Sequence, residues 1–92
     1  MARVLTHVVP DGTASGIVAG LGDIKVVGIL AFRAEKDFRL YSGTAATEAN
    51  LVAQAGSDCK HAFMMFPENR EVPCNGVYAA FDNAHGGIIY YI

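Results

Sequence analysis

The chain has 92 residues, of which 52% are hydrophobic and 17% are charged, and its net charge is −2. This length holds one hydrophobic core, so we expect a single domain over residues 1–92. The charges form no basic run, which excludes a dedicated nucleic-acid binder, and no apolar run reaches the ~20 residues that span a membrane. Residues 1–7 lack the pattern of a secretory signal, so we expect folding in a cytoplasm without processing.

Alternating apolar and polar residues between turn signals predict seven or eight short strands. The expected strands cover residues 3–9, 15–19, 23–33, 38–41, 50–55, 60–66, 77–82 and 88–92, with a short extended piece at 72–73. Turns are expected at Pro10-Asp11-Gly12, Asn75-Gly76 and Gly86-Gly87. Even spacing of strands and turns predicts an all-β fold, a single small antiparallel β-sandwich or jelly-roll-like barrel.

The segment 44–54 is ambiguous. Its alanines and Glu48 are compatible with one or two helical turns capped by Thr44 or Thr47. We favour a loop followed by a short strand over 50–55, because closely spaced strands leave little room for a packed helix.

The strand over 23–33 is apolar on both faces, which is unusual for a sheet with one side in water. Strict alternation places Ile24, Val26, Leu30 and Phe32 on one face and Val27, Ile29 and Ala31 on the other. The final strand, 88–92, repeats this feature, with Ile89 and Tyr91 on a second apolar face. Tyr91 fits either a subunit interface or a sandwich edge, where it would lie flat over turn residues. The final strand should pair within its own sheet, and another subunit should cover its second face.

Catalytic and metal-binding patterns are weak. Ser15-Gly16 and Ser42-Gly43 lie at turns without a nucleophile elbow, and Gly20-Leu21-Gly22 is too short for a dinucleotide loop. A site of Cys59, His61 and His85 can be drawn, but no close pair of ligands supports it. We therefore predict no catalytic residue, no metal and no cofactor. If 60–67 and 76–82 form a hairpin, Cys59 and Cys74 are too far apart for a disulfide.

The order of these features resembles that of small virion proteins of tailed bacteriophages. The resemblance rests on Val26-Val27-Gly28-Ile29-Leu30-Ala31, Phe38-Arg39-Leu40-Tyr41-Ser42-Gly43, Thr44-Ala45-Ala46, Asn50-Leu51-Val52, Phe66-Pro67, Gly76-Val77-Tyr78 and Ile89-Tyr90-Tyr91. It covers about residues 23–92, and Cys59, Cys74 and Met64-Met65 depart from the pattern. The resemblance implies a β-sandwich or jelly roll that binds no cofactor and catalyses no reaction.

These observations lead us to expect a capsid decoration, or cement, protein that binds and stabilises the assembled head. Its partners would be the major capsid protein and further copies of itself, as a trimer or a dimer, within the virion. The candidate interface is Val27, Ile29, Met64, Phe66, Ile89 and Tyr91. The alternative is a small tail or fibre component that binds host-surface glycans through loop residues such as Asn69, Arg70, Asp82 and His85.

Overall fold

A computed structural model describes residues 3–33, 36–56, 63–67, 69–82 and 84–92. Within these ranges the chain forms nine strands and one short 3₁₀ helix, η1 (Glu48–Asn50). The strands are β1 (Leu5–Thr13), β2 (Gly16–Ile17), β3 (Asp23–Ala31), β4 (Phe38–Ser42), β5 (Leu51–Ala55), β6 (Phe63–Met65), β7 (Val72–Asn75), β8 (Val77–Phe81) and β9 (His85–Tyr91). The predicted all-β class is therefore confirmed.

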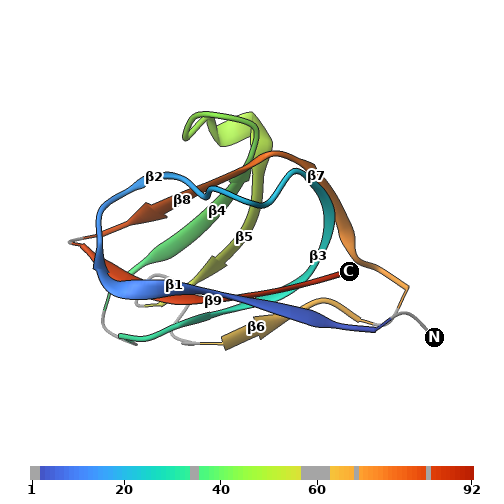
Figure 1. Ribbon diagram of the computed structural model, residues 1–92, viewed down its shortest axis with the longest axis horizontal. Coiled ribbons are helices and arrows are strands. Elements are labelled where there is room, and N and C mark those ends of the chain that lie inside the picture. Colours follow the sequence, from blue (N-terminus) through green and yellow to red (C-terminus); the bar gives the residue numbers. More distant parts are fainter. Residues whose placement is uncertain (1–2, 34–35, 57–62, 68, 83) are drawn as a thin grey trace.

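The strands form two antiparallel sheets that pack face to face (Figure 1). Sheet A has the order β1-β9-β3-β6, and sheet B has the order β2-β8-β4-β5. The long strand β3 has β9 on one side, while β6 and β7 follow one another along its other side. This arrangement is a small β-sandwich.

The described parts of 60–67 and 76–82 do not form the hairpin on which the separation of Cys59 and Cys74 was conditional. β6 pairs with β3 in sheet A, whereas β8 pairs with β2 and β4 in sheet B. Asn75-Gly76 is a corner where the chain passes from sheet A to sheet B. Gly76 adopts φ 80° there, its N–H donates to the Gly22 carbonyl, and its own carbonyl accepts from the Gly43 N–H. A glycine permits this positive φ without steric cost.

The other two predicted turns lie inside strands. The pairing of β1 with β9 jumps from Val9–Gly87 to Thr13–His85, so Pro10-Asp11-Gly12 forms a bulge within β1. Gly86-Gly87 belongs to β9, which begins at His85. Gly87 leaves room for the Phe38 ring of the opposite sheet, since a Cβ at Gly87 would lie 2.7 Å from that ring.

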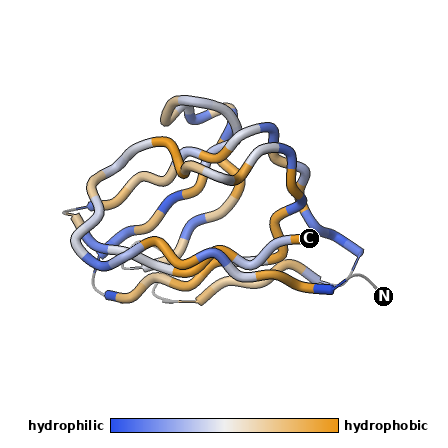
Figure 2. Tube along the Cα trace, in the orientation of Figure 1, coloured by the Kyte–Doolittle hydropathy of each residue, from blue (hydrophilic) through white to orange (hydrophobic). Residues whose placement is uncertain are grey.

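The core fills the space between the two sheets. Phe38 and Leu40 come from β4, Ile29 from β3 and Ile89 from β9, and all four side chains are fully buried. Hydrophobic segments recur along the strands of both layers (Figure 2). Phe38 also stacks on Phe81, with ring centroids 4.8 Å apart.

A β-bulge in β3 decides which side chains face this core. Val26 lies opposite Tyr91 and Gly28 lies opposite Tyr90, so β3 carries one extra residue, Val27, at this point. The extra residue reverses the alternation. Ile24 and Val26 before the bulge therefore share the inner face with Ile29 and Ala31 after it.

The segment 44–54 follows the favoured prediction. Residues 43–47 lead through the single turn η1 into strand β5, and Thr47 caps that turn without a side-chain hydrogen bond. The final strand also pairs within its own sheet as predicted, since β9 lies between β1 and β3.

Candidate functional site: the outer face of sheet A

The outer face of sheet A carries a row of four apolar side chains, one from each strand. Val8 of β1 lies opposite Ile88 of β9, Ile88 opposite Leu30 of β3, and Leu30 opposite Phe63 of β6. Directly opposed residues of antiparallel strands point to the same side of the sheet. The row therefore crosses the whole sheet on the side away from the core.

A second row runs beside the first, formed by Thr6, Tyr90, Gly28 and Met65. A Cβ at Gly28 would collide with the Met65 sulfur, so the Met65 side chain lies directly over Gly28. The rings of Tyr90 and Phe63 meet edge to face across this gap, with centroids 6.0 Å apart. These contacts close the surface between β9 and β6.

Much of this surface is in contact with solvent. Val8 is 54% exposed, Phe63 48% and Met65 43%, and Phe32, two residues beyond Leu30, is 41% exposed. With ~4.8 Å between the four strands and ~6.8 Å between the two rows, the rows cover roughly 260 Å². The largest exposed apolar patch of a small protein often serves an interaction. We call it the outer face and define it by Val8, Leu30, Phe32, Phe63, Met65, Ile88 and Tyr90.

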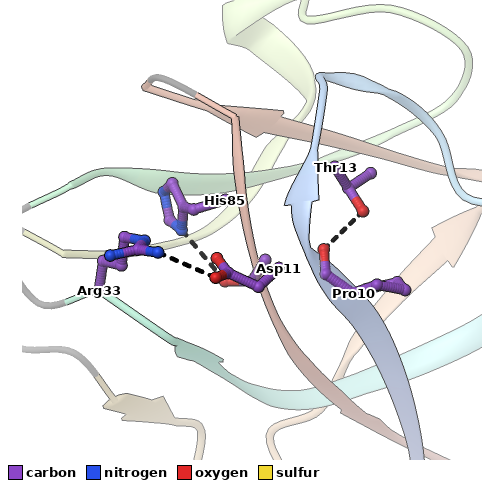
Figure 3. A network of polar contacts seen from close by, with 6 residues as sticks. Pro10, Asp11, Thr13, Arg33 and His85 are labelled. Atoms are coloured by element: carbon purple, nitrogen blue, oxygen red, sulfur yellow. Dashed lines mark hydrogen bonds and ion pairs between the residues drawn. The ribbon is translucent and has the colours of Figure 1, made fainter.

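Charged groups lie at the margins of the outer face. Lys25 precedes the bulge in β3, and its N–H and carbonyl pair with Ile92. At the other end, the Arg33 guanidinium donates to the Asp11 carboxylate at 2.9 Å, which links the β1 bulge to the end of β3 (Figure 3). Both side chains are about half exposed, so this ion pair contributes at most about 1 kcal/mol.

Five of the six predicted interface residues belong to the core side of the sheet. Ile29 and Ile89 are fully buried in the core, and Met64, Phe66 and Tyr91 pack against it. Val27 is the half-buried bulge residue. The face assignment was therefore wrong, although the second apolar face that it anticipated exists and is built from their sequence neighbours Leu30, Met65, Ile88 and Tyr90.

The start of β3 shows which side chains face the core, but only as far as the bulge. Asp23 and Lys25 are exposed and alternate with Ile24 and Val26, so those two apolar residues point inward. Strict alternation from that start puts Leu30 inside and Ile29 outside. The bulge inverts this assignment, and the sequence marks it only by the glycine at position 28.

His85 is a structural residue of the core. Its side chain is fully buried, with Nε2 2.9 Å from the Asp37 carbonyl oxygen and Nδ1 3.1 Å from the Gly86 carbonyl oxygen. Its ring also meets Phe81 edge to face. Cys59 and His61 lie outside the described residues, so the cluster drawn with His85 is not placed. Among the described residues, no three His, Cys, Asp or Glu side chains gather as metal ligands do.

Cys74 is a buried thiol between the two sheets. Its Sγ lies 3.2 Å from the Gly76 carbonyl oxygen and 3.9 Å from that of Tyr41. Burial raises the pKa of the Cys74 thiol, and a hydrogen bond with Ser42 opposes this shift. A raised pKa disfavours the thiolate that nucleophilic chemistry needs. Because Cys59 lies outside the described residues, the prediction about a disulfide remains a prediction.

Cys74 also lines a hollow of about 670 Å³ at the edge where β3 and β7 meet β4. Its other walls are Asp23, Ile24, Lys25, Ser42, Pro73, Asn75 and Ile92. The Ser42 hydroxyl accepts the Asn75 N–H at 3.0 Å and so holds β7 against β4. Ser42 therefore supports the contact between the two sheets.

The four loop residues considered for glycan binding do not form one site. Asn69 and Arg70 follow β6 at one end of the sandwich, and Asp82 follows β8 at the other end (Figure 1). His85 is near Asp82 in sequence but is buried.

In the part of the chain that the structure describes, no helix is long and apolar enough to span a membrane. Comparisons with protein-family models, curated proteins and solved structures found no match to this chain. The fold and the site together define a small β-sandwich with an apolar sheet face in contact with solvent.

Proposed function

We propose that the protein is a structural subunit of a tailed-phage virion, a capsid decoration protein that docks on the assembled head through its outer face. The observation that carries the proposal is the apolar row Val8–Ile88–Leu30–Phe63 on the solvent side of sheet A. The sequence resemblance to small virion proteins supports the choice of partner. The major capsid protein and further copies of this chain would be its contacts, with no cofactor and no reaction.

The size of the outer face suits repeated weak docking. A standard stable interface buries about 800 Å² on each partner, so a face of roughly 260 Å² gives one copy only modest affinity. A shell offers the same site many times, and neighbouring copies that also contact one another dissociate less readily than one copy alone. A ligand that binds only the assembled shell stabilises it by mass action.

The test uses particles of the phage that encodes this chain, depleted of the protein and then reloaded. Phe63→Asp puts a charge at the β6 end of the apolar row, where docking would desolvate it at high cost. The matched control is Ile17→Asp, because Ile17 is 63% exposed but lies on β2 in sheet B. We expect wild type and the Ile17 variant to bind and raise the temperature of particle disruption, and the Phe63 variant to do neither.

Equal binding by both variants would refute docking through the outer face, and unchanged particle stability would refute the cement role. Labelled protein distinguishes the two virion locations. Signal over the head supports decoration, whereas signal confined to the tail supports the alternative, a small tail component.

A further inference from the structure

The hydrogen bonds of β9 show which backbone N–H and carbonyl groups of β1 point away from sheet A. Lys25 and Ile92 exchange both of their backbone hydrogen bonds, at 3.0 and 2.9 Å, and the Phe32 N–H donates to the Gly86 carbonyl at 3.0 Å. Backbone groups alternate in direction along a strand. The even-numbered residues of β9 therefore face β3, and the odd-numbered residues face β1.

The odd-numbered residues of β9 pair with Leu5, His7 and Val9 of β1. Those three residues direct their N–H and carbonyl groups into the sheet. Val4, Thr6 and Val8 consequently direct theirs away from it. β1 is the outermost strand of sheet A, and no other strand of the described residues pairs with this side of it.

The same edge is blocked from Pro10 onward. Pro10 has the same parity as Val8, so the N–H that it lacks would have pointed outward. Its carbonyl accepts a hydrogen bond from the Thr13 hydroxyl (Figure 3). Proline and bulges are the usual devices that prevent an edge strand from pairing. They protect one half of the β1 edge and leave Val4–Val8 open.

The open half has the composition of a pairing strand. It reads Val-Leu-Thr-His-Val, with no Lys, Asp or Glu, and Val4 and Val8 are 48% and 54% exposed. β-branched residues fit a paired strand well. Nothing in this half works against pairing with another strand.

We propose that a second copy of the chain pairs here, β1 to β1, in antiparallel orientation around a two-fold axis at Thr6. This register places Thr6 opposite Thr6 of the second copy and Val4 opposite its Val8. All six outward N–H groups, three on each copy, then meet outward carbonyl groups. Shifting the axis to His7 would place Pro10 opposite Val4, where proline has no N–H to donate and its carbonyl is already used.

The paired β1 strands would join two A sheets into one. Val4 of the second copy would extend the row Val8–Ile88–Leu30–Phe63, and the two outer faces would become a single surface of roughly 520 Å². A two-fold contact of this kind predicts a dimer rather than a trimer. The inference goes beyond the proposed function, since copies can pair whether or not the outer face docks on a capsid.

A cysteine scan tests the register. Opposed residues of a hydrogen-bonded pair have Cα atoms about 5.5 Å apart, which suits a disulfide. Thr6→Cys should therefore crosslink to its own copy under mild oxidation. Val8→Cys is the matched control on the same face, because the two copies of position 8 would lie about 14 Å apart. We expect a covalent dimer from the Thr6 variant alone, above the background that wild type shows with Cys59 and Cys74. Failure of the Thr6 variant to crosslink, or equal crosslinking of both, would overturn the register.

Sedimentation of three proteins tests the interface itself. Wild type should have the mass of a dimer at micromolar concentration, and Thr6→Pro should have the mass of a monomer. The Thr6 N–H makes no bond within sheet A, so this variant should retain the circular dichroism of the β-sandwich. Phe63→Asp should remain a dimer. A monomeric wild type, or a dimer broken by the Phe63 variant and not by the Thr6 variant, would overturn the inference. A Phe63 variant that still binds particles would refute the proposed function and leave the dimer intact.

Discussion

Truncation of two adjacent isoleucines to alanine measures which face of β9 holds the fold together. Ile89 is fully buried between the sheets, whereas Ile88 is partly exposed on the outer face. Ile89→Ala and Ile88→Ala remove the same atoms from neighbouring positions of one strand. Strand propensity and chain entropy therefore change equally, and the difference in unfolding free energy reports burial.

The expected costs differ severalfold. Truncating a fully buried isoleucine costs about 2–5 kcal/mol, because the transfer term adds to that of the cavity left behind. Ile88 loses only partial contacts with Val8 and Leu30, and we expect about 1 kcal/mol. A domain of this size has a total stability of roughly 5–14 kcal/mol. With about 4–8 °C lost per kcal/mol, a loss of ~3 kcal/mol for Ile89→Ala lowers Tm by about 12–24 °C.

Urea unfolding followed by circular dichroism provides the measurement. Both substitutions belong in the Thr6→Pro background, so that self-association does not add to the apparent stability. Equal costs, or a larger cost at Ile88, would mean that Ile88 faces the core. The inverted alternation derived from the β3 bulge would then be wrong.

Three further predictions concern other parts of the fold. Gly56→Ala should unfold the domain or cost several kcal/mol, because Gly56 has φ 106° and a Cβ there would strike the Lys36 carbonyl; Gly12→Ala, with φ 90° and open space around it, should cost only about 1 kcal/mol. Burial raises the pKa of the Cys74 thiol, so the contribution of the buried un-ionised thiol to stability is complete below the ordinary thiol pKa of 9.0 and is lost as the pH rises above it. The unfolding free energy should therefore fall less steeply above pH 9.0 in Cys74→Ala than in wild type. Asp11→Asn should cost less than about 1 kcal/mol, and added salt should reduce that cost, because its ion pair with Arg33 is solvent-exposed; a loss of several kcal/mol would contradict this.

The sequence was sufficient to predict the strands but not their partners. Period-two alternation is local, and it located most of the strands and the all-β class. Pairing depends on contacts between distant segments, and the same turn residues fit more than one connection. Asn75-Gly76 suits a hairpin and also suits the corner that carries the chain from β7 in sheet A to β8 in sheet B.

The outer face was anticipated as a surface and misassigned residue by residue. A strand has only two faces, so one extra residue exchanges every side chain beyond it. In β3 the extra residue is Val27. Because β3 pairs with β9, the assignment of Ile88–Ile92 to the two faces of the sheet was exchanged as well. The sequence Val26-Val27-Gly28 is apolar throughout, so hydropathy alone gives no sign of a bulge there. Only the paired strand shows that Gly28 lies opposite Tyr90.

The apolar residues that make the charge content of the chain low lie at definite places in the structure. The core needs one apolar face from each sheet, and Val8, Leu30, Phe63 and Ile88 add a third face that no described residue covers. The edge of the same sheet is protected from Pro10 onward and open over Val4–Val8. An excess of apolar residues without a role would not place a boundary at Pro10, because an edge strand that pairs with nothing is expected to be protected along its whole length. The position of Pro10 therefore favours a specific pairing site on β1 over an apolar surface without a role. Val8→Pro, which extends the protection two residues further along the edge, should leave the sandwich folded and monomeric.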